Sequence, residues 1–170
     1  MWRVRSPYLK DPRRLPDVIA AVQLIGAAHR PERKISDWTR ELTGDEKEAE
    51  IERWTAVFNE HPEFFLVYRL QEDPALKAAL RLRYINKLYD AATHKEYTQA
   101  EKDKLDKPAR DLLTTRPLSG EMITAMTNTA IALHTSAVAE LSARRWWVAL
   151  LTAFLGFVGA VSGAYLGAHK

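Results

Sequence analysis

The C-terminal end of the chain is the feature that most restricts its fold. From Trp146 to Ala168 there are 23 consecutive residues without a formal charge. A helix rises about 1.5 Å per residue, so this stretch would cross the roughly 30 Å hydrocarbon core of a bilayer. Basic and aromatic residues stand where membrane boundaries are expected: Arg144, Arg145, Trp146, Trp147 and Tyr165. The sequence predicts a transmembrane helix over 146–168, against the alternative of a buried core helix.

The position of this segment predicts a tail anchor. About 145 more polar residues precede it, and the N-terminus has no apolar core of signal-peptide length. The arginine pair before the segment outweighs Lys170 after it, which favours a cytoplasmic N-terminal domain. We therefore expect a single-pass protein whose partners include the lipid bilayer.

A glycine stripe runs through the same segment. Glycines let helices approach closely in lipid, where association depends on backbone packing rather than on the hydrophobic effect. The stripe predicts a homo-oligomer and consists of Gly156, Gly159, Gly163 and Gly167.

Residues 119–145 are expected to form a juxtamembrane helix. Its apolar positions follow the 3-4 spacing of a helix–helix seam: Ile123, Met126, Ala130, Leu133 and Ala137. Between Glu121 and Glu140 no residue carries a formal charge, which indicates packing on more than one side. The helix either packs on its own head domain or continues the transmembrane helix into a bundle.

The pattern before residue 93 predicts a small winged-helix-like domain within a mainly α fold. Three short helices are expected after Pro16, over 35–42 and over 45–60. The stretches FFLVYRL and LKAALRLRY, with Pro74 between them, suggest a β-hairpin, although the second could equally be helical. Helices followed by a hairpin have the winged-helix order, a variant of the helix-turn-helix.

These patterns divide the chain into five parts. They are an N-terminal arm (1–14), the winged-helix-like domain (15–92), a charged linker with a short helix (93–118), the juxtamembrane helix (119–145) and the transmembrane helix (146–168).

The charge distribution argues against ordinary helix-turn-helix binding to DNA. Residues 1–40, 41–75, 76–116 and 117–170 carry +5, −7, +4 and +1, which together give the chain's +3. The third helix, which would enter the major groove, lies in the acidic part and would repel phosphates. Nucleic acid is thus a less favoured partner, and its candidate contacts, or those of another ligand, are Arg13, Arg14, Arg30, Arg33, Lys34, Arg81 and Arg83.

Sequence motifs for catalysis are missing. The five histidines form no HxxxH or HExxH pair, no glycine-rich phosphate loop precedes a helix, and the chain has no cysteine. We expect no catalytic residues, no metal ligands and no cofactor, and therefore a protein that is not an enzyme.

Several segments in combination resemble a family of uncharacterised short bacterial proteins. The resemblance rests on RLPDVIAAVQLIG, on WTAVFNEHPEFF, on RPLSGEMITAMTNTAIALHTSA and on the RWW before a glycine-rich tail, and covers most of residues 14–168. It implies a winged-helix-like domain with a C-terminal transmembrane helix in the bacterial inner membrane. It implies no activity.

The sequence supports two functional hypotheses. The first is a non-enzymatic tail-anchored protein that homo-oligomerises through its helical tail, while its cytosolic head senses or docks another protein. In its most specific form this is a membrane-perturbing effector of phage defence. The second is a membrane-tethered regulator that binds nucleic acid.

Overall fold

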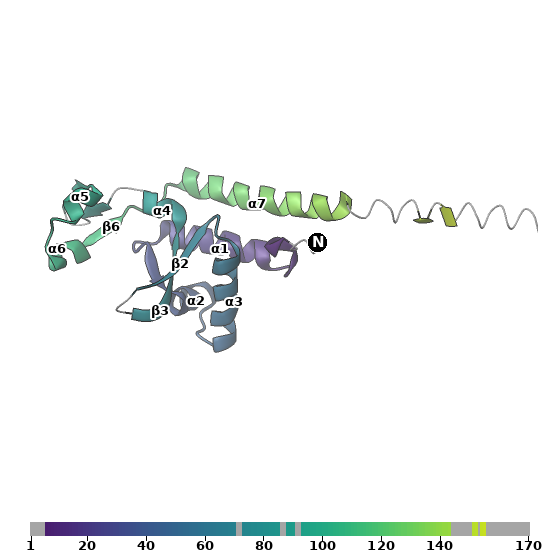
Figure 1. Ribbon diagram of the computed structural model, residues 1–170, viewed down its shortest axis with the longest axis horizontal. Coiled ribbons are helices and arrows are strands. Elements are labelled where there is room, and N and C mark those ends of the chain that lie inside the picture. The colour runs from purple at the N-terminus through teal and green to yellow at the C-terminus, as the bar shows by residue number, and fades with distance from the viewer. Residues whose placement is uncertain are drawn as a thin grey trace, which may run out of the picture.

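The computed structural model describes residues 6–70, 73–85, 88–90, 93–143, 151–152 and 154–155. Its first part, called the head here, is a set of helices around one small sheet (Figure 1). The head consists of the 3₁₀ helix η1 (Pro7–Leu9), α1 (Arg14–Ala27), β1 (Glu32–Lys34), α2 (Ile35–Thr43), α3 (Glu48–Glu60), β2 (Phe65–Leu70), β3 (Asp73–Leu80) and α4 (Arg81–Ile85).

The head sheet has the order β1–β3–β2, so the last strand lies between the first two. Both pairings are antiparallel, with Lys34 opposite Lys77 and Phe65 opposite Leu80. Its inner face packs on the three long helices of the head, and the core there combines aliphatic with large aromatic side chains. The largest apolar side chains buried in it are Trp38, Trp54, Phe58 and Phe65.

Two polar contacts fix the helices within this core. The indole Nε1 of Trp38 donates to the carbonyl of Ala78 at 2.9 Å, which ties α2 to β3. Arg53 on α3 donates to the carboxylate of Asp17 on α1 at 3.1 Å. Because both pairs are largely buried, each satisfies a group that would otherwise be costly to desolvate.

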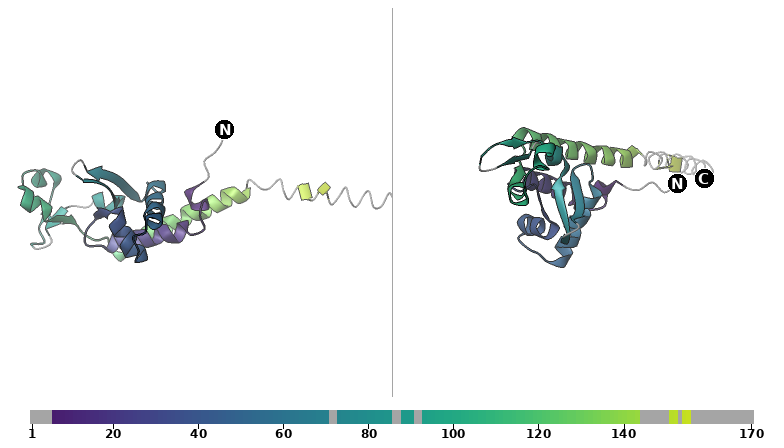
Figure 2. Two further views of the ribbon diagram at one scale, coloured as in Figure 1. Left: turned by 90° about the horizontal axis from the view of Figure 1, so that it is seen from below. Right: turned by 60° about the vertical axis from the view of Figure 1, so that its left-hand side comes forward.

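A second three-stranded sheet follows the head. It has the order β5–β4–β6, again antiparallel, and lies beyond α4, at the opposite end of the described structure from the last residues of α7 (Figures 1 and 2). Its elements are β4 (Leu88–Asp90), β5 (Glu96–Tyr97), α5 (Gln99–Lys102), α6 (Lys107–Asp111) and β6 (Leu113–Thr115). The sequence predicted only a charged linker with one short helix here.

The buried guanidinium of Arg83 joins the head to this second sheet. Its Nη1 donates to the carbonyls of Ile25 at 2.9 Å and Ala28 at 2.6 Å, at the C-terminal end of α1. Its Nη2 donates to the carbonyl of Thr115 in β6 at 2.6 Å. The last carbonyls of a helix have no partner within the helix and carry partial negative charge, so a cation suits this position. Burial lowers the pKa of Arg83 to about 10, which leaves it charged at neutral pH.

The long helix α7 (Gly120–Ala143) lies against α1 and η1 along the head (Figures 1 and 2). Leu118, just before it, donates its backbone N–H to the carbonyl of Gly26 at 2.9 Å. A Cβ placed on Gly26 would lie only 3.0 Å from Cγ1 of Ile123 on α7. The missing side chain of Gly26 is therefore what allows the two helices to approach closely.

The predicted fold class is wrong as stated. The described residues form two three-stranded sheets, whereas one hairpin was expected. The stretch LKAALRLRY divides between β3 and α4, and Pro74 lies in β3 rather than in the turn. This division has a physical reason: Leu80 completes the buried end of β3, and the change to a helix at Arg81 turns the side chain of Arg83 toward α1.

The predicted membrane segment also needs correction. No helix formed by the described residues combines the length and apolar character needed to cross a membrane. At 24 residues α7 is long enough, but its interspersed hydroxyl, amide and imidazole side chains make it too polar. The tail anchor and the inner-membrane location are therefore not supported, whereas the bilayer as a partner stays a prediction. Most of 146–168 lies outside the described residues, as do Arg144 and Arg145.

Replacing Arg83 tests its role at this junction. Arg83→Met leaves buried carbonyls of α1 and β6 without donors, and we expect it to lower the free energy of unfolding by about 3–5 kcal/mol. Urea denaturation followed by circular dichroism measures the change. The matched control is Arg81→Met, which removes one exposed side-chain bond to Pro62 and should cost less than about 1 kcal/mol. Equal losses in the two variants would refute a special role for Arg83.

The close approach of α1 and α7 gives a second prediction. Gly26→Val forces branched atoms against Ile123 and should destabilise the protein by about 1–3 kcal/mol. Adding Ile123→Ala, which makes room, should recover part of that loss even though Ile123→Ala alone is destabilising. A double-mutant cycle measured by thermal unfolding checks this coupling, and strictly additive effects would contradict it.

Candidate interaction surface

The basic residues predicted as nucleic-acid contacts do not form one open surface. Arg83 is fully buried, and Arg14 is 7% exposed and pairs with Glu60 at 3.0 Å. Arg13 pairs with Asp11 at its own turn, and Arg81 donates to the carbonyl of Pro62. These four residues are divided between the start of α1 and α4, and two of them, Arg14 and Arg83, are buried.

The remaining three, Arg30, Arg33 and Lys34, line a groove of about 420 Å³ beside β1 and α2. Carboxylates occupy the same groove and its rim. Arg33 pairs with Glu41, and Lys34 lies 3.6 Å from Asp73. The other lining residues are Glu32, Asp37, Arg40 and Lys77. A phosphate backbone would have to displace these internal pairs, so the groove is a poor site for nucleic acid.

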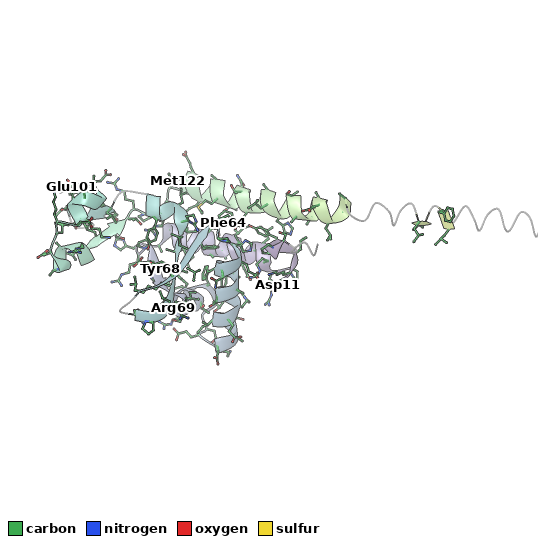
Figure 3. All side chains as sticks on the ribbon, in the orientation of Figure 1. Asp11, Phe64, Tyr68, Arg69, Glu101 and Met122 are labelled. Carbon is green, nitrogen blue, oxygen red and sulfur yellow. The ribbon has the colours of Figure 1, made fainter. Side chains whose placement is uncertain are left out.

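Glu32 of this groove also holds two tyrosines. Its carboxylate accepts hydrogen bonds from the hydroxyls of Tyr68, on β2, and of Tyr84, on α4. Tyr68 can be seen on β2 in Figure 3. Burial and the Glu32 carboxylate raise the pKa of Tyr84 to about 12, so its hydroxyl stays protonated and continues to donate. Both hydrogen bonds end on the same oxygen, Oε2 of Glu32, which links β1 to β2 and to α4.

One histidine pair has the geometry of an acid–base site. Nδ1 of His61 lies 2.9 Å from a carboxylate oxygen of Glu63, and its Nε2 has no partner. However, the imidazole is completely buried, and the Tyr8 ring lies over it with the ring centroids 4.4 Å apart. Burial, followed by the charge of Glu63, raises the pKa of the Tyr8 hydroxyl. A substrate has no access to this imidazole.

Metal ligation has no support within the described ranges. No group of three or more His, Cys, Asp or Glu side chains there is arranged to hold a metal ion. The predicted oligomerisation glycines and membrane-boundary residues, from Arg144 through Gly167, lie outside the described residues.

The helix α7 has two different faces. Its inner face packs on α1 and η1 through residues at 3-4 spacing: Ile123, Met126, Thr127, Ala130, His134, Ala137 and Leu141. The sequence predicts Leu133 in the helix–helix seam, whereas in the structure His134 takes that place on the inner face. His134 faces inward because its ring meets the edge of Tyr8, with centroids 6.0 Å apart, while Leu133 points outward.

The outer face of α7, which we define as its exposed residues from Met122 to Ser142, has no charged residue between Glu121 and Glu140. Large apolar side chains on it are 40–43% exposed: Met122, Ile131, Leu133 and Val138. Figure 3 shows Met122 near the start of the helix, on its solvent side. A solvated helix normally carries Glu and Lys at such positions, so this composition is unusual for a surface that meets only water.

Most hydroxyls on this face are already hydrogen-bonded. Four exposed side chains donate to the carbonyl four residues earlier, at 2.8–3.0 Å: Thr124, Thr129, Thr135 and Ser142. A hydroxyl that bonds to its own helix loses little when water is removed. The outer face can therefore be covered without leaving these donors unsatisfied.

Sequence reasoning found the uncharged stretch but not which residues face outward. Apolar periodicity assigned the faces, and it could not show that His134, a polar residue, lies on the packed side. Comparison with family models, curated proteins and solved structures gave no match. The resemblance to a family of short bacterial proteins therefore stays a prediction.

The two faces should respond differently to the same substitution. Ala130 is fully buried, so Ala130→Leu should overpack the contact with α1 and cost about 1–3 kcal/mol. Ala132 is exposed, and Ala132→Leu should change stability by less than about 0.5 kcal/mol in dilute solution. Thermal unfolding of both variants checks this. A larger loss at position 132 would mean that the faces are assigned the wrong way round.

Proposed function

We propose that this protein is a non-enzymatic interaction module that docks another protein along the outer face of α7. The observation that carries the proposal is the uncharged outer face itself, with its exposed apolar side chains and internally bonded hydroxyls. Covering the part of this face from Met122 to Ala139 removes apolar surface from water and buries no charge. The partner is therefore a protein surface that is itself apolar and uncharged.

The head acts as a scaffold in this proposal. It holds α7 along much of its length through Gly26, Ile123 and the contact between Tyr8 and His134. An isolated helix of this length would have to be ordered on binding, at an entropic cost. Because the head has already ordered α7, its outer face is presented in the conformation that binds.

The paired cations and the buried histidine support this choice over the alternatives. Arg33, Lys34 and Arg14 each have a carboxylate partner, which weakens the case for a regulator that binds nucleic acid. The burial of His61 weakens the case for an acid–base enzyme. No separate observation favours either function.

Photo-crosslinking tests the proposal in cells. Benzophenylalanine replaces Leu133 on the outer face or, as the control, Leu112, which is 67% exposed on the loop before β6. We expect discrete crosslinked proteins from position 133 and few from position 112. Adding Ile131→Glu, which places a charge in the covered face, should remove the products from position 133.

Two results would contradict the proposal. One is a similar crosslinking yield from both positions, which would show that the yield depends on exposure alone. The other is the absence of any protein adduct at position 133 in a chain whose circular dichroism shows that it is folded.

A further inference from the structure

We infer that the partner on the outer face of α7 is a second copy of the chain, whose α7 lies antiparallel to the first about a two-fold axis at Ala132. The inference rests on the proposed function, because it names the partner of the same surface. It follows from the order of residues along that face, from the charges at its ends and from two polar side chains near its centre.

The outward residues are arranged almost symmetrically about Ala132. In an antiparallel pair centred there, each residue meets the one at the same distance on the other side of the centre. Ala125 then lies opposite Ala139, and Ile131 opposite Leu133. All of these residues are exposed. Small residues thus meet small ones along the middle of the face, where the helix axes approach most closely, and branched apolar residues pack beside them.

Two polar side chains on this face make no hydrogen bond within α7 as described. They are Asn128, which carries the only side-chain amide of the helix, and Ser136, whose hydroxyl does not bond back as the other four do. Both are exposed, and both lie four residues from Ala132. Antiparallel pairing brings Asn128 of one copy opposite Ser136 of the other. The amide can then donate to the hydroxyl, which satisfies both groups and fixes the alignment.

The charges at the ends of the face favour the antiparallel direction. Parallel helices would place Glu121 beside Glu121 and Glu140 beside Glu140, so that like charges meet at both ends. In the antiparallel pair Glu140 lies opposite Thr124, and Glu121 lies opposite Ala143. The dipoles of antiparallel helices also attract each other, whereas those of parallel helices repel. The whole stretch between the two glutamates then meets an equally uncharged copy of itself.

The absence of cysteine from the chain makes a direct test possible. Single cysteines are placed in the full-length protein as Ala132→Cys, Ala125→Cys and Ala139→Cys, and disulfides are formed by mild oxidation. Ala132→Cys should give a covalent dimer. Ala125→Cys alone should give at least about tenfold less, because its two copies lie about 21 Å apart along the axis, beyond disulfide reach. A mixture of Ala125→Cys and Ala139→Cys, with tags of different size, should give the mixed dimer.

Each other outcome is decisive. Efficient dimers from Ala125→Cys alone would show parallel pairing and overturn the inference. No disulfide at any position, together with adducts to a different protein from benzophenylalanine at position 133, would also overturn it while leaving the proposed function standing. Adducts only within one chain, with residues 146–168 on the outer face, would overturn both. Leu133→Glu should abolish the dimer of Ala132→Cys, whereas Leu112→Glu should not change it.

Discussion

The guanidinium of Arg83 at the C-terminal end of α1 is the interaction on which the rest of the structure depends. It is buried, and it donates to carbonyls of α1 and of β6 at the same time. A neutral side chain could not meet so many acceptors, and a lysine lacks the planar fork that reaches both segments. Through this contact the end of the first helix, the start of α4 and the last strand of the second sheet are held at one point.

The position of α7 follows from that junction. Leu118 comes three residues after Thr115 and donates to Gly26, so the chain enters α7 directly over the end of α1. Gly26 then allows the helices to approach, and the ring of His134 settles against Tyr8 further along. These contacts lie on the inner face of α7, which packs on the head. The other has neither the charges of a solvated surface nor a covering element among the described residues, which is why we propose it as the docking surface.

Some of these elements and contacts could be predicted from the sequence, and the others could not, for physical reasons. Apolar periodicity placed the helices around Val22, Trp38 and Trp54, because burial of one face imposes that spacing. The boundary between β3 and α4 could not be predicted, because the pattern of LKAALRLRY fits a strand or a helix. The long-range contact of Arg83 determines where the strand ends and the helix begins. Arg83 was taken for a surface cation because composition does not show which carbonyls lie nearby. The uncharged outer face was visible in the sequence, but the inward turn of His134 depends on Tyr8, more than a hundred residues away.

The antiparallel pairing of α7 through its outer face is the central claim, and one distance tests it most directly. A spin label at position 125 of the full-length protein allows the separation between the two copies to be measured by double electron–electron resonance. In the antiparallel pair centred on Ala132 the two backbones at this position are about 21 Å apart along the axis, to which the reach of the labels is added. A distribution centred near or above that separation is the predicted result. Backbones within about 10 Å, as in a parallel pair, or no coupling between copies at all, would contradict the claim.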